Sequence, residues 1–274
     1  MPRLLLRRLA RTVAALVGSS VFLLVVWQIA LRVVHVSPFI AKRPTDVWDY
    51  LFTDPRFGTA TAAGNRSHVL SLLWGTLKDA GVGFSFGVAA SVLLAVVFAL
   101  VPPLEAMFLP LAMVMRTIPL VGFAPIIYII FGNGTTTVAL LGTIVVFFPI
   151  LINMALGLRS ASPQSVDLVR VYGGSRWTAV RMVAIPSALP NFFASLKIAV
   201  PFSLVGAMLY EWLFSLKGLG GEITVANAHS LYVETWTIVV VVAAVSILLY
   251  NLVDFIEAPV LALWGPKAGN YEAV

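Results

Sequence analysis

Cysteine is absent from this chain of 274 residues, which excludes structural disulfides, thiolate metal sites and cysteine nucleophiles. Charged residues are also scarce, at 11% of the sequence, while hydrophobic residues make up 60%. A protein with so little charge cannot present most of its surface to water. The composition therefore predicts an integral membrane protein.

Motifs of several enzyme classes are missing as well. The chain has no G-x-x-x-x-G-K-[ST] phosphate loop, no H-E-x-x-H pair and no G-x-G-x-x-G turn. Its histidines, His35, His68 and His229, lie far apart, show no metal-ligand spacing and are expected in loops near the outer surface. The basic residues are scattered at segment ends, which argues against nucleic-acid binding. We expect no catalysis, no metal and no cofactor on this chain.

Apolar stretches close to the length of a membrane-crossing helix, about 20 residues, recur along the sequence. They lie near residues 13–34, 79–101, 106–131, 137–158, 190–214 and 236–263. The first follows a basic start but is long for a signal peptide, which predicts an uncleaved span. The sequence therefore predicts an all-α polytopic bundle of six transmembrane helices.

The loops between the spans suggest an organisation and an orientation. We expect a basic segment and first span in 1–34, an extracytoplasmic loop with a short interfacial helix in 35–78, a five-helix core in 79–264 and a tail in 265–274. Cytosolic termini and a cytosolic 159–189 segment place nine basic residues inside and six outside, so the positive-inside rule favours this orientation by a small margin. The inside set is Arg3, Arg7, Arg8, Arg11, Arg159, Arg170, Arg176, Arg181 and Lys267.

Small residues recur at intervals of four in the second span, at Gly83, Gly87 and Ser91. In lipid, residues of this size allow another helix backbone to approach closely. A glycine hinge is the alternative, and packing is the favoured interpretation.

The third span carries Pro110, Pro119 and Pro125 in or beside it, which predicts a kinked or partly unwound segment. Irregular backbone at membrane depth occurs where protein or a water-filled cavity surrounds it. Two interpretations stay open, a solute pathway and a kinked helix without solute contact. The candidate pathway residues are Met113, Arg116, Ile118, Pro119, Asn153 and Glu211.

Charges within the apolar segments need a cavity, a partner or access to the membrane edge. For Arg116 and Glu211 all three environments remain possible, whereas Lys197 is expected to extend its ammonium to the membrane edge. Asp254 and Glu257 share one helical face, which fits either an ion site or a solvated cytosolic helix end, and we favour the helix end.

A polar island, Asp167 to Pro186, separates two long apolar segments. Gly173 and Gly174 are typical of a helix end, and Ser175 is a typical cap of the next helix. Ile185 before Pro186 is expected to close that second helix. About 30 residues between spans cannot fold alone, so Trp177 and Val180 on one face predict a docking partner, while a loop at the lipid headgroups is the alternative.

The island resembles the cytosolic motif of binding-protein-dependent ABC importer permeases, which reads E-A-A, three residues, G, nine residues, I-x-L-P. Asp167, Leu168 and Val169 stand at E-A-A, Gly173 at the glycine, and 183–186 at the closing I-x-L-P. Further stretches resemble the nitrate, sulfonate and taurine type of permease over roughly residues 65–263. They are RTIPLVGFAP (116–125), FFPILINMALGL (147–158) and EWLFSLKGLG (211–220).

The resemblance implies a type I ABC importer permease fold in a bacterial plasma (inner) membrane. The island would be the coupling loop that docks on a cytosolic ATPase dimer, and a second permease subunit, identical or paralogous, would complete the pathway. ATP and Mg²⁺ would bind to the ATPase, and an extracytoplasmic binding protein would deliver a small polar or anionic solute such as a sulfonate, nitrate, taurine or a vitamin precursor. The implied coupling residues are Asp167, Leu168, Val169, Gly173, Gly174, Ser175, Arg176, Trp177, Ile185 and Pro186.

A self-sufficient secondary transporter is the alternative function. It would use Glu211, Asp254 and Glu257 as ion sites, but no inverted repeat is evident between the two halves of the chain.

Overall fold

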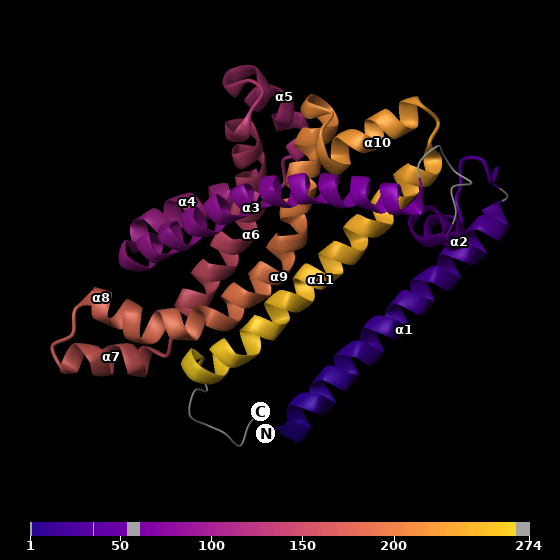
Figure 1. Cartoon of the computed structure of the whole chain (residues 1–274). Helices are drawn as coiled ribbons and strands as arrows, with labels where there is room; N and C mark the ends of the chain where they lie inside the picture. The colour runs from indigo at the N-terminus through magenta and orange to yellow at the C-terminus, as the bar shows by residue number, and fades with distance from the viewer. Residues whose placement is uncertain (1, 35, 54–60, 267–274) are drawn as a thin grey trace. The chain divides into compact units, whose positions relative to one another are not determined.

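The computed structural model describes residues 2–34, 36–53 and 61–266, with side chains from residue 18 onward (Figure 1). His35, Lys267 and the tail to residue 274 lie outside the described residues, as do the side chains of Arg3, Arg7, Arg8 and Arg11. Every regular element within the described ranges is a helix. The chain divides into two compact units, Met1–Leu70 with Val225–Val239, and Ser71–Thr224 with Val240–Val274.

The first unit contains α1 (Pro2–Val34), α2 (Pro44–Trp48) and a π-helical turn, η1 (Asp49–Thr53). Aromatic stacking supports it: the rings of Trp27 and Trp236 stack with centroids 5.2 Å apart. The Trp236 indole N–H donates to the carbonyl of Ile40 at 2.9 Å, which anchors the chain between α1 and α2. The Asn65 amide donates to the carbonyl of Tyr50 and so holds η1.

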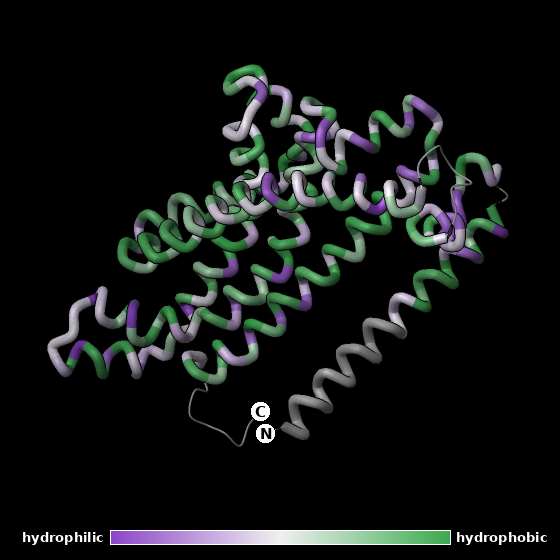
Figure 2. The backbone as a smooth tube through the Cα atoms, in the orientation of Figure 1, coloured by the Kyte–Doolittle hydropathy of each residue, from purple (hydrophilic) through white to green (hydrophobic). Residues whose placement is uncertain are grey.

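The second unit is built around α6 (Thr135–Arg159) and α9 (Ile185–Tyr210), which pack along each other. In the most apolar 18-residue stretch of α6, half of the residues are buried, against 6% in that of α11 (Tyr232–Trp264). The central helix is therefore α6. Its side chains Leu141 and Ile150 are completely buried. Figure 2 shows mainly hydrophobic residues along α6 and α9 and more hydrophilic ones in the polar island.

Glycines bring three backbones together at the centre of this unit. A Cβ on Gly83 of α3 (Ala62–Leu100) would lie 2.6 Å from the Gly142 Cα of α6, and one on Gly206 of α9 would lie 3.1 Å from that atom. A Cβ on Gly87 would approach Val146 to 2.8 Å. The Ser91 hydroxyl lies within hydrogen-bond distance of the carbonyl of Phe147, at 2.9 Å. The small residues of α3 therefore lie directly against α6.

Four helical runs are long and apolar enough to cross a membrane: Ala62–Leu100, Thr135–Arg159, Arg176–Ser215 and Tyr232–Trp264. The third expected span is a bent pair, α4 (Pro102–Met115) and α5 (Leu120–Phe131), whose axes differ by 101°. The expected irregularity there is confirmed, and the break directly precedes Pro119, which begins α5 as its cap. Counting this pair as one span gives five, and Gly18–Val34 is a shorter apolar helix.

Two expected helix boundaries are wrong. The short interfacial helix within 35–78 is instead the beginning of α3, because no proline interrupts residues 62–100. Ile185 and Pro186 do not close a helix either. A π-helical turn, η3 (Val180–Ala184), precedes them, with the Ile185 N–H bonded to the Val180 carbonyl, and the helix continues into α9. The π-helical turn lets the helix continue through Pro186 although proline has no backbone N–H to donate.

One string fits an enzyme motif by its letters alone. Residues 83–87 read G-F-S-F-G, as in the G-x-S-x-G elbow that exposes a serine nucleophile on a strand-to-helix turn. These residues lie inside the uninterrupted α3, and the Ser85 hydroxyl donates to the carbonyl of Gly81 in the same helix at 2.7 Å. The elbow geometry is therefore not present at Ser85.

We predict that Gly83→Ala lowers the thermal unfolding midpoint of the purified protein, because the new methyl group would overlap the backbone of α6 at Gly142. The expected cost is about 1–3 kcal/mol. Gly81→Ala is the matched control in the same helix, since a Cβ at Gly81 meets nothing within 4 Å. Equal midpoints for the two variants would contradict this account of the packing.

Candidate functional site

The polar island contains the end of one short helix, a turn and a second short helix. The first helix, α7 (Pro163–Val171), starts four residues before the island and is capped by Ser162, whose hydroxyl accepts from the backbone N–H of Ser165. The second helix, α8 (Arg176–Ala179), begins at Ser175, whose hydroxyl accepts from the Thr178 N–H at 3.2 Å. Serine caps therefore start both helices.

The turn between them depends on the two glycines. Gly173 has φ +78°, in the left-handed region that favours glycine. The Gly174 N–H closes the end of α7 by donating to the Val169 carbonyl at 2.8 Å. A Cβ on Gly174 would approach the Val169 side chain to 2.5 Å. The absence of a side chain at Gly174 therefore leaves room for Val169, which stands where the E-A-A motif has the smaller alanine.

The second helix of the island is continuous with a membrane-spanning helix. From Arg176 the chain runs through α8, η3, α9 and η4 (Glu211–Ser215) as one helical run of 40 residues. The island at one end of this run is thus joined covalently, through an unbroken helix, to the η4 end. Figure 1 shows α7 beside α8 at one end of α9.

Large apolar side chains of the island are exposed. Leu168 is 58% exposed and Trp177 is 50% exposed, and the other exposed ones are Val171, Tyr172 and Met182. The expectation that Trp177 and Val180 share one docking face is wrong for Val180, which is buried. Asp167 forms an ion pair with Arg170 at 3.4 Å, and both side chains are exposed.

Glu211 has its partner inside the protein. Its side chain is buried, and its Oε2 lies 2.9 Å from both the Thr76 hydroxyl and the Gly220 N–H. The Thr76 hydroxyl in turn accepts from the Leu219 N–H at 2.9 Å. Of the alternatives left open for Glu211, a partner or a cavity or the membrane edge, the structure shows the partner.

The glycines after Glu211 leave room for its carboxyl group. Gly218 has φ +68°, and a Cβ there would overlap the Glu211 carboxyl group. A Cβ on Gly220 would overlap the carbonyl of Met208. The stretch EWLFSLKGLG is therefore a buried acid and the tight turn that closes over it, leading into α10 (Gly218–Ala228).

The neighbouring Tyr210 holds a second connection. Its hydroxyl is hydrogen-bonded to the Asn133 side chain and accepts from the Gly134 N–H at 3.1 Å, in the turn between α5 and α6. Tyr128 stacks on Phe214 with centroids 4.3 Å apart. We call Thr76, Tyr210, Glu211, Leu219 and Gly220 the joint, because it fixes the end of α9 to α3, α10 and the α5–α6 turn.

The pathway candidates do not form one cluster. Arg116 caps the C-terminal end of α4, and Met113, Ile118 and Pro119 lie near it, all exposed. The Asn153 amide donates within its own helix to the carbonyl of Pro149 at 2.9 Å. In the described conformation Glu211 belongs to the joint instead of to this exposed group.

The expectations for Lys197 and Glu257 are wrong, because the Lys197 ammonium is ion-paired with Asp254 and Glu257 and its side chain is only 17% exposed. Glu257 is similarly shielded, at 18% exposed. Asp254 is 51% exposed, as expected of a solvated helix end. These pairs connect α9 to α11.

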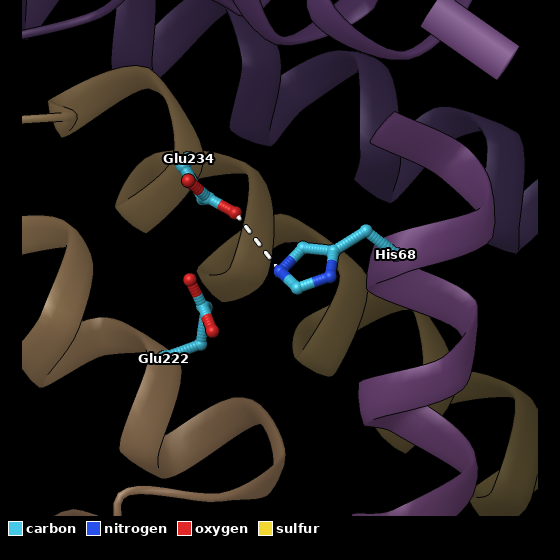
Figure 3. A group of neighbouring side chains, drawn as sticks. All are labelled: His68, Glu222 and Glu234. Atoms are coloured by element: carbon cyan, nitrogen blue, oxygen red, sulfur yellow. Dashed lines mark ion pairs between the residues drawn. The ribbon is translucent and has the colours of Figure 1, made fainter. Parts of the chain in front are cut away.

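His68 is also not a loop residue. It lies on α3 and its Nε2 faces Glu234 of α11, 3.6 Å from Oε1, in the first unit (Figure 3). No local sequence pattern signals this pairing, because the two residues are far apart in the chain. The partners of Glu211 and Tyr210 were missed for the same reason.

Comparison with known proteins identifies the family to which these features belong. Residues 87–258 match the family described as binding-protein-dependent transport system inner membrane component. The match lies within the span of residues over which the sequence resembles ABC importer permeases, and that resemblance is confirmed.

Three proteins similar to this chain are named for different solutes. The formylaminopyrimidine transport permease protein of Halalkalibacterium halodurans is 28% identical over 72% of this chain and 75% of its own length. The taurine transport system permease protein of Escherichia coli is 23% identical, covering 89% of this chain and 86% of its own. The nitrate import permease protein of Leptolyngbya laminosa is 26% identical, covering 95% and 96%.

We predict that Thr76→Val destabilises the purified protein by about 1–3 kcal/mol, because it leaves the Glu211 carboxyl group and the Leu219 N–H short of a buried partner. Thermal unfolding measures the effect, and Thr76→Ser should restore the midpoint. Ser85→Ala is the matched control on α3, since its hydroxyl bonds only within that helix. A Thr76→Val midpoint equal to that of Ser85→Ala would show that the joint carries no stability.

Proposed function

Because the chain belongs to the family of binding-protein-dependent transport system inner membrane components, we propose that its island transmits ATP-driven motion from a cytosolic ATPase dimer to a solute pathway. The protein is a multi-pass inner membrane permease of an ABC transporter, and members of this family are non-catalytic. ATP and Mg²⁺ bind on the ATPase in this proposal. The family assignment supports this function over that of a self-sufficient secondary transporter.

The observation that carries the proposal is the unbroken helical run from Arg176 to Ser215. A straight helix of 40 residues is about 60 Å long and crosses the bilayer. Its first turns, to Pro186, belong to the island, and its last turns hold Tyr210 and Glu211 of the joint. A push on the island therefore displaces the joint and the α5–α6 turn that Tyr210 holds.

The exposed apolar residues of the island supply a docking surface. Leu168 and Trp177 project from the two helices of the island, beside the exposed side chains of Val171 and Tyr172. Exposed aromatic and aliphatic side chains of this kind are typical anchors at the centre of a protein interface. The proposed occupant is a groove of the ATPase.

The bent α4–α5 pair is the proposed lining of the pathway, shared with a second permease subunit. Met113, Arg116, Ile118 and Pro119 lie exposed at the bend. An exposed guanidinium there would attract an anionic or polar solute. With the first helix and the bent pair each counted as one span, the chain crosses the membrane six times and both termini are cytosolic.

The proposed substrate is a small polar or anionic solute delivered by an extracytoplasmic binding protein. The relatives' names include taurine, nitrate and a formylaminopyrimidine, which are small and polar. Closure of the ATPase dimer would rock the permeases between inward and outward openings.

We predict that Leu168→Glu combined with Trp177→Glu weakens copurification of the ATPase by about tenfold or more, because interface anchors typically contribute more than 1 kcal/mol each. Quantifying the ATPase bound to purified permease checks this. Leu231→Glu, which introduces one carboxylate at an exposed leucine between α10 and α11, should have no effect.

The same system tests transmission. Binding-protein-stimulated ATP hydrolysis should be lost when Gly173→Pro is combined with Asp167→Arg, because proline cannot adopt the φ of +78° that the turn requires. Stimulation at the wild-type level in this variant would exclude the island as the coupling element.

A further inference from the structure

A cavity of about 330 Å³ lies behind the island, between α7, α8 and the membrane helices. Its walls come from the last turns of α3, the first turns of α4, the end of α6 and both island helices. The space exists because alanines form much of the wall: Ala95, Ala99, Ala155, Ala179 and Ala184.

Three arginines and one acid lie among the residues that line the cavity. The arginines are Arg159, Arg170 and Arg176, and the acid is Glu105. Glu105 is buried, and its Oε1 lies 2.7 Å from Nε of Arg159, so this pair is neutral. Arg170 has an exposed ion pair with Asp167 at 3.4 Å.

Arg176 has spare donors. Within the part of the chain that the structure describes, no acid pairs with its guanidinium, and the residue is exposed beside the apolar wall. A guanidinium binds phosphate oxygens with two parallel hydrogen bonds, a geometry that lysine does not match. The rim is thus suited to a phosphate group.

The wall selects an amphiphile over a free anion. Eleven of the fifteen lining residues are apolar and four are charged. A free inorganic anion needs donors on all sides, whereas a phospholipid places its phosphate at the rim and its glycerol and first methylenes against the alanines. The cavity also lies where α3 and α6 end, and the proposed topology places these helix ends at the boundary between membrane and water, where headgroups are found.

We infer that this cavity binds the headgroup of an anionic phospholipid, with the phosphate held by Arg176 and Arg159. Because the island forms one wall, a bound lipid stabilises the position of α7 and α8 against α3 and α6. The inference rests on the membrane position of the chain and on the proposed cytosolic location of the island. Coupling would then depend on the lipid composition of the membrane.

Native mass spectrometry of the transporter with its ATPase, taken from nanodiscs of equal phosphatidylglycerol and phosphatidylethanolamine, tests the inference. The wild type should retain phosphatidylglycerol in preference, and Arg176→Gln should reduce that retention by about threefold to tenfold, because a charge-assisted hydrogen bond is lost. Arg159→Gln with Glu105→Gln should reduce it further while keeping the pair neutral. Arg181→Gln is the matched control, an exposed arginine of η3 that does not line the cavity.

Equal retention of both lipids by the wild type, or unchanged retention in a folded Arg176→Gln protein, would overturn the inference. Displacement of the lipid by millimolar inorganic phosphate or glycerophosphate would identify a free-anion site and overturn it as well. Failure of the coupling proposal gives a different result, since a permease that retains phosphatidylglycerol but shows no binding-protein stimulation contradicts coupling alone.

Discussion

The close approach of three backbones at Gly142 is the contact on which the rest of this structure depends. In lipid, the burial of apolar side chains does not drive helices together, so association relies on close packing and internal hydrogen bonds. Gly83 of α3 and Gly206 of α9 both lie against Gly142 of α6. That arrangement places Thr76, two turns earlier on α3, within reach of Glu211 at the far end of α9.

The joint turns this packing into a mechanical connection. A buried carboxyl group needs several partners, and Glu211 finds them on α3 and at the start of α10. Tyr210, the residue before it, holds the α5–α6 turn. One end of a single helical run is thus hydrogen-bonded to α3, α10 and the α5–α6 turn, while the other end is part of the island. Lys197, midway along α9, attaches α11 through its two ion pairs.

Local patterns of the sequence predicted the features that depend on neighbouring residues. The caps at Ser175, the left-handed Gly173 and the interruption near Pro119 follow from residues within one or two turns, and the family follows from ordered motifs. Contacts between distant segments were not predictable, because nothing near Glu211 points to Thr76, 135 positions earlier. The prediction that a helix ends at Pro186 was wrong because a π-helical turn of five residues precedes the proline and the helix continues. Composition alone does not distinguish such a turn from a helix end.

The central claim is that the run from Arg176 to Ser215 moves as one rigid body when the ATPase closes. Because the chain contains no cysteine, pairs of introduced cysteines can carry spin labels without background. Labels at Met182 and Phe202, both exposed on this run and about 30 Å apart, should show the same distance with and without ATP. Labels at Met182 and Val114 of α4 should show a distance that changes between the two states. A changed Met182–Phe202 distance would show that the helix bends at or after η3, and would contradict transmission from the island to the joint.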